Sequence, residues 1–337
     1  MRAFVVTGPG KAEVQQVEAP AARPGEVVVD VERAGICGTD VEFFTGEMSY
    51  LHTGQASYPM RIGHEWSGTV AALGDGVDPG WLGRRVTGDT MLGCGHCHRC
   101  LSGRQHVCAE RYEIGVRNGW PGALAEQLPV PVKALQALPG TVDAALGALV
   151  EPGGNALRAV RGAALEPGQR LLVLGPGTIG LLAAQIAAAQ GAEVHLLGRG
   201  SPAFPASIGF TAVWTRETLP ELPWDAVIDA SNAAELPALA AELVEPGRRV
   251  VYIGISGRPS LLDTRTLALK DVTAVGVLSA SGGFAGTVEL YASGAVDPRP
   301  LIAATVGLHE VAAALAGVRR PGWSDAPKIH VDPRLLP

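Results

Sequence analysis

The sequence predicts an α/β protein in which a β-rich first part precedes a doubly wound parallel sheet. Two patterns lead to this prediction. Short β-branched runs, broken by Gly and Pro, fill the first 36 residues. From Arg170 onward, apolar strand patterns alternate with helices or loops, which is typical of a parallel sheet. The 337 residues are enough for about two domains, each with its own core.

In the first part, we expect strands at 3–6, 12–17, 27–31 and 66–73, with a turn at 20–24. The segment 43–60 is polar but carries Phe44, Tyr50, His52 and Tyr58. It is either an ordinary surface loop or the wall of a substrate pocket, since candidate metal ligands flank it at both ends.

The later elements also follow from periodicity. Strands are expected at 170–174, 193–197, 212–214, 225–229, 249–253 and 273–278, and helices at 155–161, 181–190 and 234–244. The crossover at 202–210 is short and broken by Pro, so a helix there is doubtful. Helices at 284–292 and 309–317 and a strand at 328–331 form a tail that is expected to return to the first domain.

A glycine-rich turn lies between the strand at 170–174 and the next helix. Gly175-Pro176-Gly177-Thr178-Ile179-Gly180 fits the pattern G-x-G-x-x-G, and this context makes it a strong sign of dinucleotide binding. Gly175 allows the tight turn, Gly177 lets a pyrophosphate approach, and Gly180 lets the helix pack on the strand. The N–H groups at the start of the helix then face the phosphates.

The end of the second strand of this sheet indicates which nicotinamide cofactor binds. An acidic residue there would bind the ribose 2′-hydroxyl of NAD, but the sequence reads Gly198-Arg199-Gly200-Ser201. Arg199 can pair with a 2′-phosphate and Ser201 can donate a hydrogen bond to it. We therefore predict NADP. The alternative is that Arg199 is a solvated surface residue and that both cofactors bind.

Four of the five cysteines are closely spaced. Cys94, Cys97, Cys100 and Cys108 match the ligand set of a closed tetrahedral zinc–sulfur site, which has a structural role. The alternative is a group of free buried cysteines. Because four thiolates complete the site, His96, His98 and His106 are expected at the surface.

The fifth cysteine is the centre of the predicted reactive site. Cys37 offers a thiolate, His64 an imidazole, and Glu65 or Glu151 a carboxylate, and such a set with one water makes an open zinc site. A lone Cys in a Gly-rich turn is ordinarily structural, but the rest of the sequence favours a ligand here.

Composition excludes several other classes of protein. The net charge is −6 and no Lys/Arg run occurs, which argues against nucleic-acid binding. The 171–189 stretch is uncharged, but a Gly-Pro-Gly turn interrupts it, so we expect strand, turn and buried helix and no membrane contact. The N-terminus has too short an apolar run for a signal peptide. Together with the C-x-x-C spacing, this predicts a cytoplasmic protein.

These motifs, in this order, resemble the zinc-dependent medium-chain dehydrogenases/reductases, the alcohol and polyol dehydrogenase family. The resemblance extends over essentially the whole chain and rests on five motifs: 35–40, 63–65, the four cysteines, Glu151-Pro152 and the Gly175 turn. It implies a GroES-like catalytic domain at 1–152 and 279–337, with a structural zinc lobe at about 89–110. A Rossmann domain is implied at 153–278.

The resemblance also implies a mechanism and two zinc ions per chain. Cys37 and His64 would bind the catalytic zinc, with Glu65 or Glu151 as third protein ligand, since family members differ on this point. Zinc would act as a Lewis acid on the substrate oxygen while a hydride passes to the nicotinamide. Thr39 would lie on the proton path, and Asp40 would orient His64 and fix its tautomer. Asp40 could instead be a turn-capping residue.

One position departs from the family. Many members have a histidine three residues after this Thr, where the present sequence has Glu42. The Thr-Asp-x-Glu pattern resembles the microbial glucose dehydrogenases, which often prefer NADP. Glu42 is therefore a hypothetical acceptor of hydrogen bonds from sugar hydroxyls.

The resulting prediction is a zinc-dependent oxidoreductase that uses NADP(H), with NAD possible, on a sugar, polyol or related secondary alcohol or carbonyl. Alternatives are a biosynthetic carbonyl reductase, an NAD-dependent alcohol or amino-alcohol dehydrogenase, and a non-catalytic NADP-binding protein. The family commonly forms homodimers or homotetramers through sheet edges, and 273–278 is the candidate edge strand.

Overall fold

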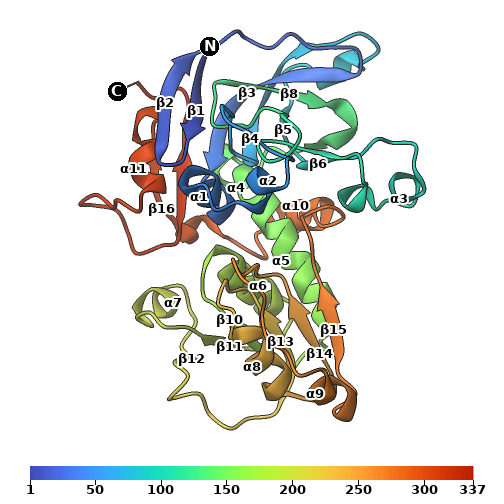
Figure 1. Ribbon diagram of the computed structural model, residues 1–337, viewed down its shortest axis with the longest axis vertical. Helices are drawn as coiled ribbons and strands as arrows, with labels where there is room; N and C mark the ends of the chain where they lie inside the picture. The colour runs from blue at the N-terminus through green and yellow to red at the C-terminus, as the bar shows by residue number, and fades with distance from the viewer. Residues whose placement is uncertain (337) are drawn as a thin grey trace. The chain divides into compact units, whose positions relative to one another are not determined.

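The computed structural model describes residues 1–336, and the chain divides into two compact units. Unit 1 comprises Met1–Glu151, Val288–Ala292 and the residues from 301 onward, and unit 2 comprises Pro152–Thr287 and Ser293–Pro300. Each unit has its own sheet (Figure 1). No helix within residues 1–336 is both long enough and apolar enough to cross a bilayer.

Unit 1 is built on a sheet of seven strands. Its strand order is β16-β17-β3-β4-β5-β9. β17 pairs with the end of β3, and β8 pairs with its first half, residues 26–30. Its strands are β3 (Glu26–Gly35), β4 (Glu65–Leu73), β5 (Arg85–Gly88), β8 (Gln127–Pro131), β9 (Leu135–Ala137), β16 (Ile302–Val306) and β17 (Lys328–Val331). Two small antiparallel pairs are β1 (Arg2–Gly8) with β2 (Lys11–Gln16), and β6 (Met91–Leu92) with β7 (Tyr112–Glu113).

Short helices connect these strands. They are α1 (Gly38–Thr45), α2 (Ser49–His52), α3 (His98–Leu101), α4 (Ala144–Ala148) and α11 (Val311–Leu315), with single 3₁₀ turns at Pro79–Trp81, Gln105–Val107, Val132–Ala134, Arg299–Leu301 and Leu308–Glu310. The core of unit 1 contains Phe4, Phe43, Ile62, Trp66 and Leu128, which are all fully buried.

The register of this sheet brings the two predicted ligand turns together. β3 ends at Gly35, which pairs with Glu65 at the start of the antiparallel strand β4. The turn after β3 carries Cys37, and the turn before β4 carries His64. Residues 27 positions apart in the sequence therefore lie at one end of one strand pair.

Unit 2 confirms the predicted doubly wound sheet. Its order is β12-β11-β10-β13-β14-β15 and all its pairs are parallel. The order reverses between β10 and β13, which is the topological switch point where such sheets bind ligands. The strands are β10 (Arg170–Leu174), β11 (Glu193–Leu197), β12 (Val213–Trp214), β13 (Trp224–Asp229), β14 (Val244–Tyr252) and β15 (Thr273–Gly276).

The helices that belong wholly or mainly to unit 2 are α5 (Val150–Ala163), α6 (Thr178–Ala189), α7 (Ala203–Ser207), α8 (Leu236–Leu243) and α9 (Thr264–Leu269), while α10 (Phe284–Ala292) runs from unit 2 into unit 1. α6 packs on β10 and β11, and α8 packs on β13 and β14. The fold class is therefore mixed α/β, as predicted.

Several details differ from the sequence-based expectation. The doubtful crossover helix exists as α7, where Pro205 is buried and the chain turns back after five helical residues. β14 already begins at Val244, which pairs with Trp224 before a register shift, so α8 ends one residue earlier than predicted. The Gly-rich turn after Cys37 continues into α1, with Cys37 as its N-cap.

The tail joins unit 1 later than expected. Residues 279–287 and 293–300 belong to unit 2 and not to the first domain. The physical reason is a set of contacts with α5: the Arg158 guanidinium donates to the carbonyls of Leu278 and Ser279, and Arg161 donates to that of Gly282. These contacts fasten the start of the tail to unit 2.

Candidate metal and cofactor sites

Three predicted ligands converge at the end of the β3–β4 pair. One donor atom from each of Cys37, His64 and Glu65 lies within 4.8 Å of the other two. His64 and Glu65 are buried, and Cys37 is half-buried. Thiolate, imidazole and carboxylate together are a donor set that suits zinc.

Burial and neighbouring charges make this position attractive to a cation. Burial alone would lower the pKa of His64, but the Asp40 carboxylate and the Cys37 sulfur outweigh it and hold that pKa well above its ordinary value. Glu151, which is also buried, contributes in the same direction from the first turn of α5. A site that stabilises a positive charge on its imidazole also favours a metal ion.

Lys328, which no sequence motif marks, is a partner of Glu65. Its Nζ donates to both Glu65 carboxylate oxygens, at 2.8 and 2.6 Å, and to the Ile36 carbonyl at 2.9 Å. Both side chains are buried, with 3% and 1% of their surface exposed. Burial lowers the pKa of Lys328, but Glu65 and Cys37 more than reverse this, so the amine stays charged. The available signal was a Lys beside Ile and Val in the predicted terminal strand.

Gly35 makes room for this ion pair. A Cβ atom at Gly35 would lie 2.0 Å from the Glu65 Oε2 atom, so no other residue leaves space for the carboxylate. The glycine before Cys37 is therefore required by a close approach across the strand pair and not by its backbone angles.

Asp40 binds the backbones of both ligand turns. Its carboxylate lies 3.7 Å from His64 Nδ1, beyond hydrogen-bond distance, and Nδ1 has no hydrogen-bond partner among the described residues. Asp40 instead accepts from the backbone N–H of Cys37 at 2.9 Å and from that of Gly63 at 3.1 Å. These contacts match the alternative role given for Asp40, a turn-capping residue, and they join the two ligand turns through their backbones; the role in orienting His64 stays a prediction, since the two side chains are at ion-pair distance.

The other predicted catalytic residues lie on α1. Thr39 is half-buried in the first turn, two residues after Cys37. Glu42 is three residues further on, so it shares a helix face with Thr39. Burial, followed by the charge of Glu47, raises the pKa of Glu42. The polar segment that follows also contains α2, and Phe44, Tyr50 and Tyr58 pack against the core, so it is more than a surface loop.

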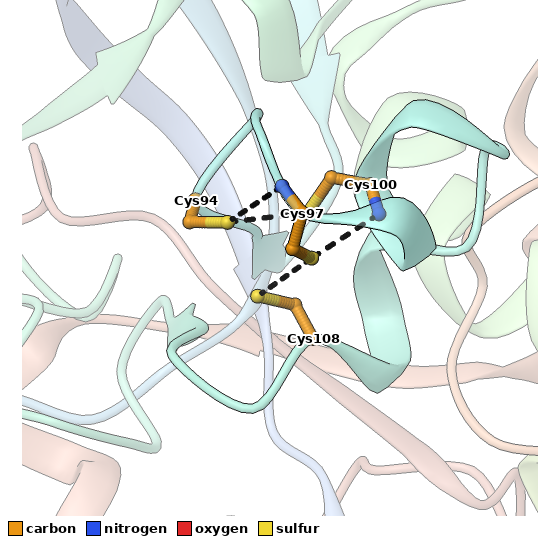
Figure 2. Close-up of side chains that lie close together, drawn as sticks. All are labelled: Cys94, Cys97, Cys100 and Cys108. Atoms are coloured by element: carbon orange, nitrogen blue, oxygen red, sulfur yellow. Dashed lines mark hydrogen bonds between the residues drawn. The ribbon is translucent and has the colours of Figure 1, made fainter.

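The four-cysteine lobe has the geometry of a zinc–sulfur site (Figure 2). The sulfur atoms of Cys94 and Cys100 are 3.9 Å apart, and those of Cys97 and Cys108 are 3.8 Å apart. A tetrahedral zinc at the usual zinc–sulfur distance holds neighbouring sulfurs about 3.8 Å apart, whereas a disulfide needs about 2 Å. Backbone N–H groups of His96 and Cys97 lower the pKa of Cys94 to about 6, while burial raises the pKa of Cys100 to about 11.

The Gly175 turn is formed as predicted for a phosphate-binding loop. Gly175 has φ +90°, and a Cβ at Gly180 would lie 2.0 Å from the Gly175 carbonyl oxygen. Gly177 is the N-cap of α6, where no side chain caps the helix and no protein atom lies within 4 Å of a Cβ position. The open glycine leaves the first N–H groups of α6 accessible to an anion.

A cavity of about 460 Å³ in unit 2 contains Arg199. Arg258, from the segment after β14, lines the same cavity, together with Asn232 and one carboxylate, Glu235. Ser201 is not part of this lining; its Oγ accepts from the N–H of Ala203. Arg258 could not be anticipated from the end of β11, because it lies about 60 residues after Arg199 in the sequence.

Comparisons with known proteins agree with this geometry. Residues 23–140 match the model of the alcohol dehydrogenase GroES-like domain. The 2-dehydro-3-deoxy-L-galactonate 5-dehydrogenase of Pseudoalteromonas atlantica is 32% identical, over 92% of this chain and 93% of the relative. The chain belongs to the medium-chain dehydrogenase/reductase family. It is an oxidoreductase of the alcohol and polyol dehydrogenase type that acts with a nicotinamide cofactor.

Of two solved structures similar to this chain, one was solved with NADP and the other with NADH. A zinc-binding dehydrogenase of Sinorhizobium meliloti 1021 was solved with NADP; it has a TM-score of 0.88 and 27% identity, over 98% of this chain and 99% of its own. An alcohol dehydrogenase of Escherichia coli CFT073 was solved with NADH, at a TM-score of 0.88 and 25% identity over the same shares. Such relatives therefore bind either cofactor.

Proposed function

We propose that this oxidoreductase is zinc-dependent and transfers a hydride between NADP(H) and a sugar, polyol or related secondary alcohol or carbonyl. The observation that carries the proposal is the convergence of Cys37, His64 and Glu65, three donors of different chemistry, at the end of one strand pair. The resemblance to a sugar-acid dehydrogenase favours a polyhydroxylated substrate.

Cys37, His64 and Glu65 would hold the reactive zinc, and Cys94, Cys97, Cys100 and Cys108 would hold the structural one. A zinc ion at the first site supplies Lewis acidity toward a substrate oxygen, and NADP(H) supplies or accepts the hydride. Among the two candidate carboxylates, the donor geometry favours Glu65. The Lys328 ammonium group balances the negative charge of the Glu65 carboxylate and holds it in place. Glu151 is close enough to raise the pKa of His64 and remains the alternative ligand.

The remaining residues of the site would orient groups and move protons. Asp40 holds the backbones of both ligand turns at one spacing. Thr39 would pass the hydroxyl proton of the substrate away from the site, because its hydroxyl both donates and accepts. Glu42 would accept hydrogen bonds from substrate hydroxyls. Loss of turnover in Glu42→Ala supports that role, and an unchanged rate and KM would assign Glu42 to the surface.

The NADP preference rests on the two arginines of the unit 2 cavity. Arg199 and Arg258 outnumber the single carboxylate Glu235 there, so the cavity favours a doubly charged phosphate. We expect Arg199→Ala and Arg258→Ala each to raise the KM for NADP⁺ by about tenfold while changing the KM for NAD⁺ little. Equal effects on both cofactors would refute the assignment.

The direct test is reduction of NADP⁺, and separately of NAD⁺, with a panel of aldoses, polyols, sugar acids, amino alcohols and simple secondary alcohols, with and without a strong zinc chelator. We expect chelator-sensitive turnover with NADP⁺ on a polyhydroxylated substrate. Turnover that persists after the metal has been removed would overturn the zinc mechanism. Turnover with NAD⁺ alone would overturn the cofactor assignment and leave the mechanism standing.

A further inference from the structure

Unit 1 contains a cavity that the proposed chemistry does not use. It has a volume of about 520 Å³ and lies between the β1–β2 hairpin and the segments 54–61 and 116–121. None of the candidate metal ligands, nor Thr39, Asp40 or Glu42, lines it. A volume of this size accommodates a small organic molecule.

The charged side chains that line the cavity are all positive. Two arginines, Arg61 and Arg117, line it, and no Asp or Glu among the described residues does. Arg61 is half-buried, and its guanidinium has no hydrogen-bond or ion-pair partner within residues 1–336. Removing a guanidinium from water without an anion beside it is unfavourable, and here burial alone lowers the pKa of Arg61.

Arg117 is also short of acceptors. Its side chain is 11% exposed, and its buried Nε has no hydrogen-bond partner among the described residues. Its nearest carboxylate is that of Glu113, 3.8 Å from Nη1, which already binds Arg111 at 2.7 Å. The Arg117 guanidinium lies over the Tyr50 ring, 5.5 Å from the centroid, which fixes its position. The single carboxylate of Glu113 thus faces the guanidiniums of both Arg111 and Arg117, so a net positive charge remains beside the cavity.

The rest of the lining suits a polar organic ligand. Gln15, Gln55, Asn118 and Ser57 offer amide and hydroxyl groups, and Trp120 offers an aromatic surface. The Trp120 indole N–H donates to the Pro129 carbonyl, and Asn118 Nδ2 donates to the Arg111 carbonyl, so both side chains are held in place. Amides and a hydroxyl beside an indole provide hydrogen bonds and stacking for a sugar-sized molecule.

We propose that this cavity is a second binding site, separate from the metal site, for a small polyhydroxylated anion whose carboxylate or phosphate group pairs with Arg61 and Arg117. The inference does not depend on the proposed activity, because it rests on the charge and shape of unit 1 alone. Arg61 precedes His64 by three residues, and its carbonyl accepts from the Gly122 N–H at 3.0 Å. A ligand bound to Arg61 would therefore contact the segment 61–64 that leads into β4 and carries His64.

Isothermal titration calorimetry on the full chain saturated with NADPH tests the proposal, because NADPH fills the phosphate-binding positions of unit 2. The probes are D-gluconate, glucose 6-phosphate, 6-phosphogluconate and inorganic phosphate, which separate carboxylate from phosphate and sugar from free ion. We expect at least one sugar anion to bind with 1:1 stoichiometry, and Arg61→Gln and Arg117→Gln each to weaken it at least tenfold. The exposed control Arg23→Gln should bind like the wild type.

A second measurement locates the ligand without any substitution. Phenylglyoxal modifies accessible arginines, and mass spectrometry reads the rate at each position. The ligand should slow modification of Arg61 at least threefold and leave that of Arg23 unchanged. No binding of any probe, equal binding by Arg61→Gln, or protection confined to other arginines would overturn the proposal.

Discussion

A row of buried polar side chains crosses the sheet of unit 1. His330 on β17 pairs with Gly35 on β3, which pairs with Glu65 on β4, and Lys328 lies two residues before His330. Side chains at cross-strand and i, i+2 positions share a face, so these groups lie on one side of the sheet. Gly35 has no side chain, and the Glu65 carboxylate occupies the space above it.

The buried ion pair predicts a strong coupling between Lys328 and Glu65. Lys328→Met leaves the Glu65 carboxylate buried and unpaired in the metal-free protein, and should lower the free energy of unfolding by about 3 kcal/mol. Glu65→Gln should cost a similar amount, and the double variant should cost little more than either alone. Urea unfolding of the chelator-treated protein measures all three, with the exposed Lys11→Met as control. Additive losses would show that the pair is not coupled.

His330 predicts how stability depends on pH. It is fully buried, neither ring nitrogen has a hydrogen-bond partner among residues 1–336, and burial, with Lys328 and Arg33, lowers its pKa to about 3. Between about pH 6.5 and pH 3, the unfolded chain binds a proton at this position and the folded chain does not. This contribution to stability is therefore lost as pH falls, by at most about 1.4 kcal/mol per unit.

His330→Leu should remove that pH dependence, because leucine has no proton to bind and no unpaired nitrogen. Urea midpoints at pH 5 and pH 7 should lie closer together in His330→Leu than in the wild type. The exposed control His52→Gln should keep the wild-type difference. If His330→Leu keeps it too, His330 does not remain neutral in the folded protein.

Among the elements, those with a strong period or a short-range motif could be predicted from the sequence. The strands β10, β11 and β13 and the helix α6 carry continuous apolar runs around a glycine turn, and their positions follow from that pattern. α1 could not be predicted, because its residues have no apolar period and its N-cap is a presumed metal ligand. β16 and α9 were missed because their half-exposed residues give weak periodicity.

Some residues of the candidate site could likewise be predicted from the sequence and others could not. Cys37, His64 and Glu65 could be predicted because they lie in short Gly-bounded motifs. Lys328 and Arg258 could not, because each reaches its partners only through pairing of strands that are distant in the sequence. For Asp40, the sequence could not decide between capping the turn and orienting His64, because only the folded turns show that the backbone N–H groups of Cys37 and Gly63 donate to its carboxylate.

The four-cysteine lobe predicts a local effect of losing one ligand. Cys108 is buried, while the other three cysteines are half-buried. Cys108→Ser should halve the zinc content and make residues 94–108 sensitive to proteases, since the short elements α3 and β6 have little core of their own. NADPH affinity, which depends on unit 2, should stay within about twofold. His96→Ala is the matched control and should keep all the zinc, and loss of zinc there would make His96 a ligand.

At the scale of the whole molecule, the order of motifs predicts the family, while the division of the chain depends on contacts. The tail changes units three times, because Val288–Ala292 packs with unit 1, the residues on both sides of it pack with unit 2, and the chain from residue 301 onward packs with unit 1. Tyr291 illustrates this: it is buried, and its hydroxyl donates to the Leu149 carbonyl in unit 1. No local pattern in the sequence marks such a change.

The edge of the unit 2 sheet predicts a homodimer. β15 ends the strand order, its outer edge has no partner strand among the described residues, and Leu269 and Leu278 are exposed near it. Pairing with a second copy would cover that edge. Ala274→Lys should place like charges opposite each other and shift the mass in light scattering toward the monomer. The exposed Ala19→Lys should not, and an unchanged mass in Ala274→Lys would exclude this edge.

Whether Cys37 holds a catalytic zinc can be tested by measuring zinc content per chain together with NADP⁺ reduction, in the wild type and in Cys37→Ser. We expect two zinc ions in the wild type and one in Cys37→Ser, with turnover at least 100-fold lower and NADPH binding retained. Wild-type turnover by a Cys37→Ser protein that has lost one zinc ion would contradict this expectation.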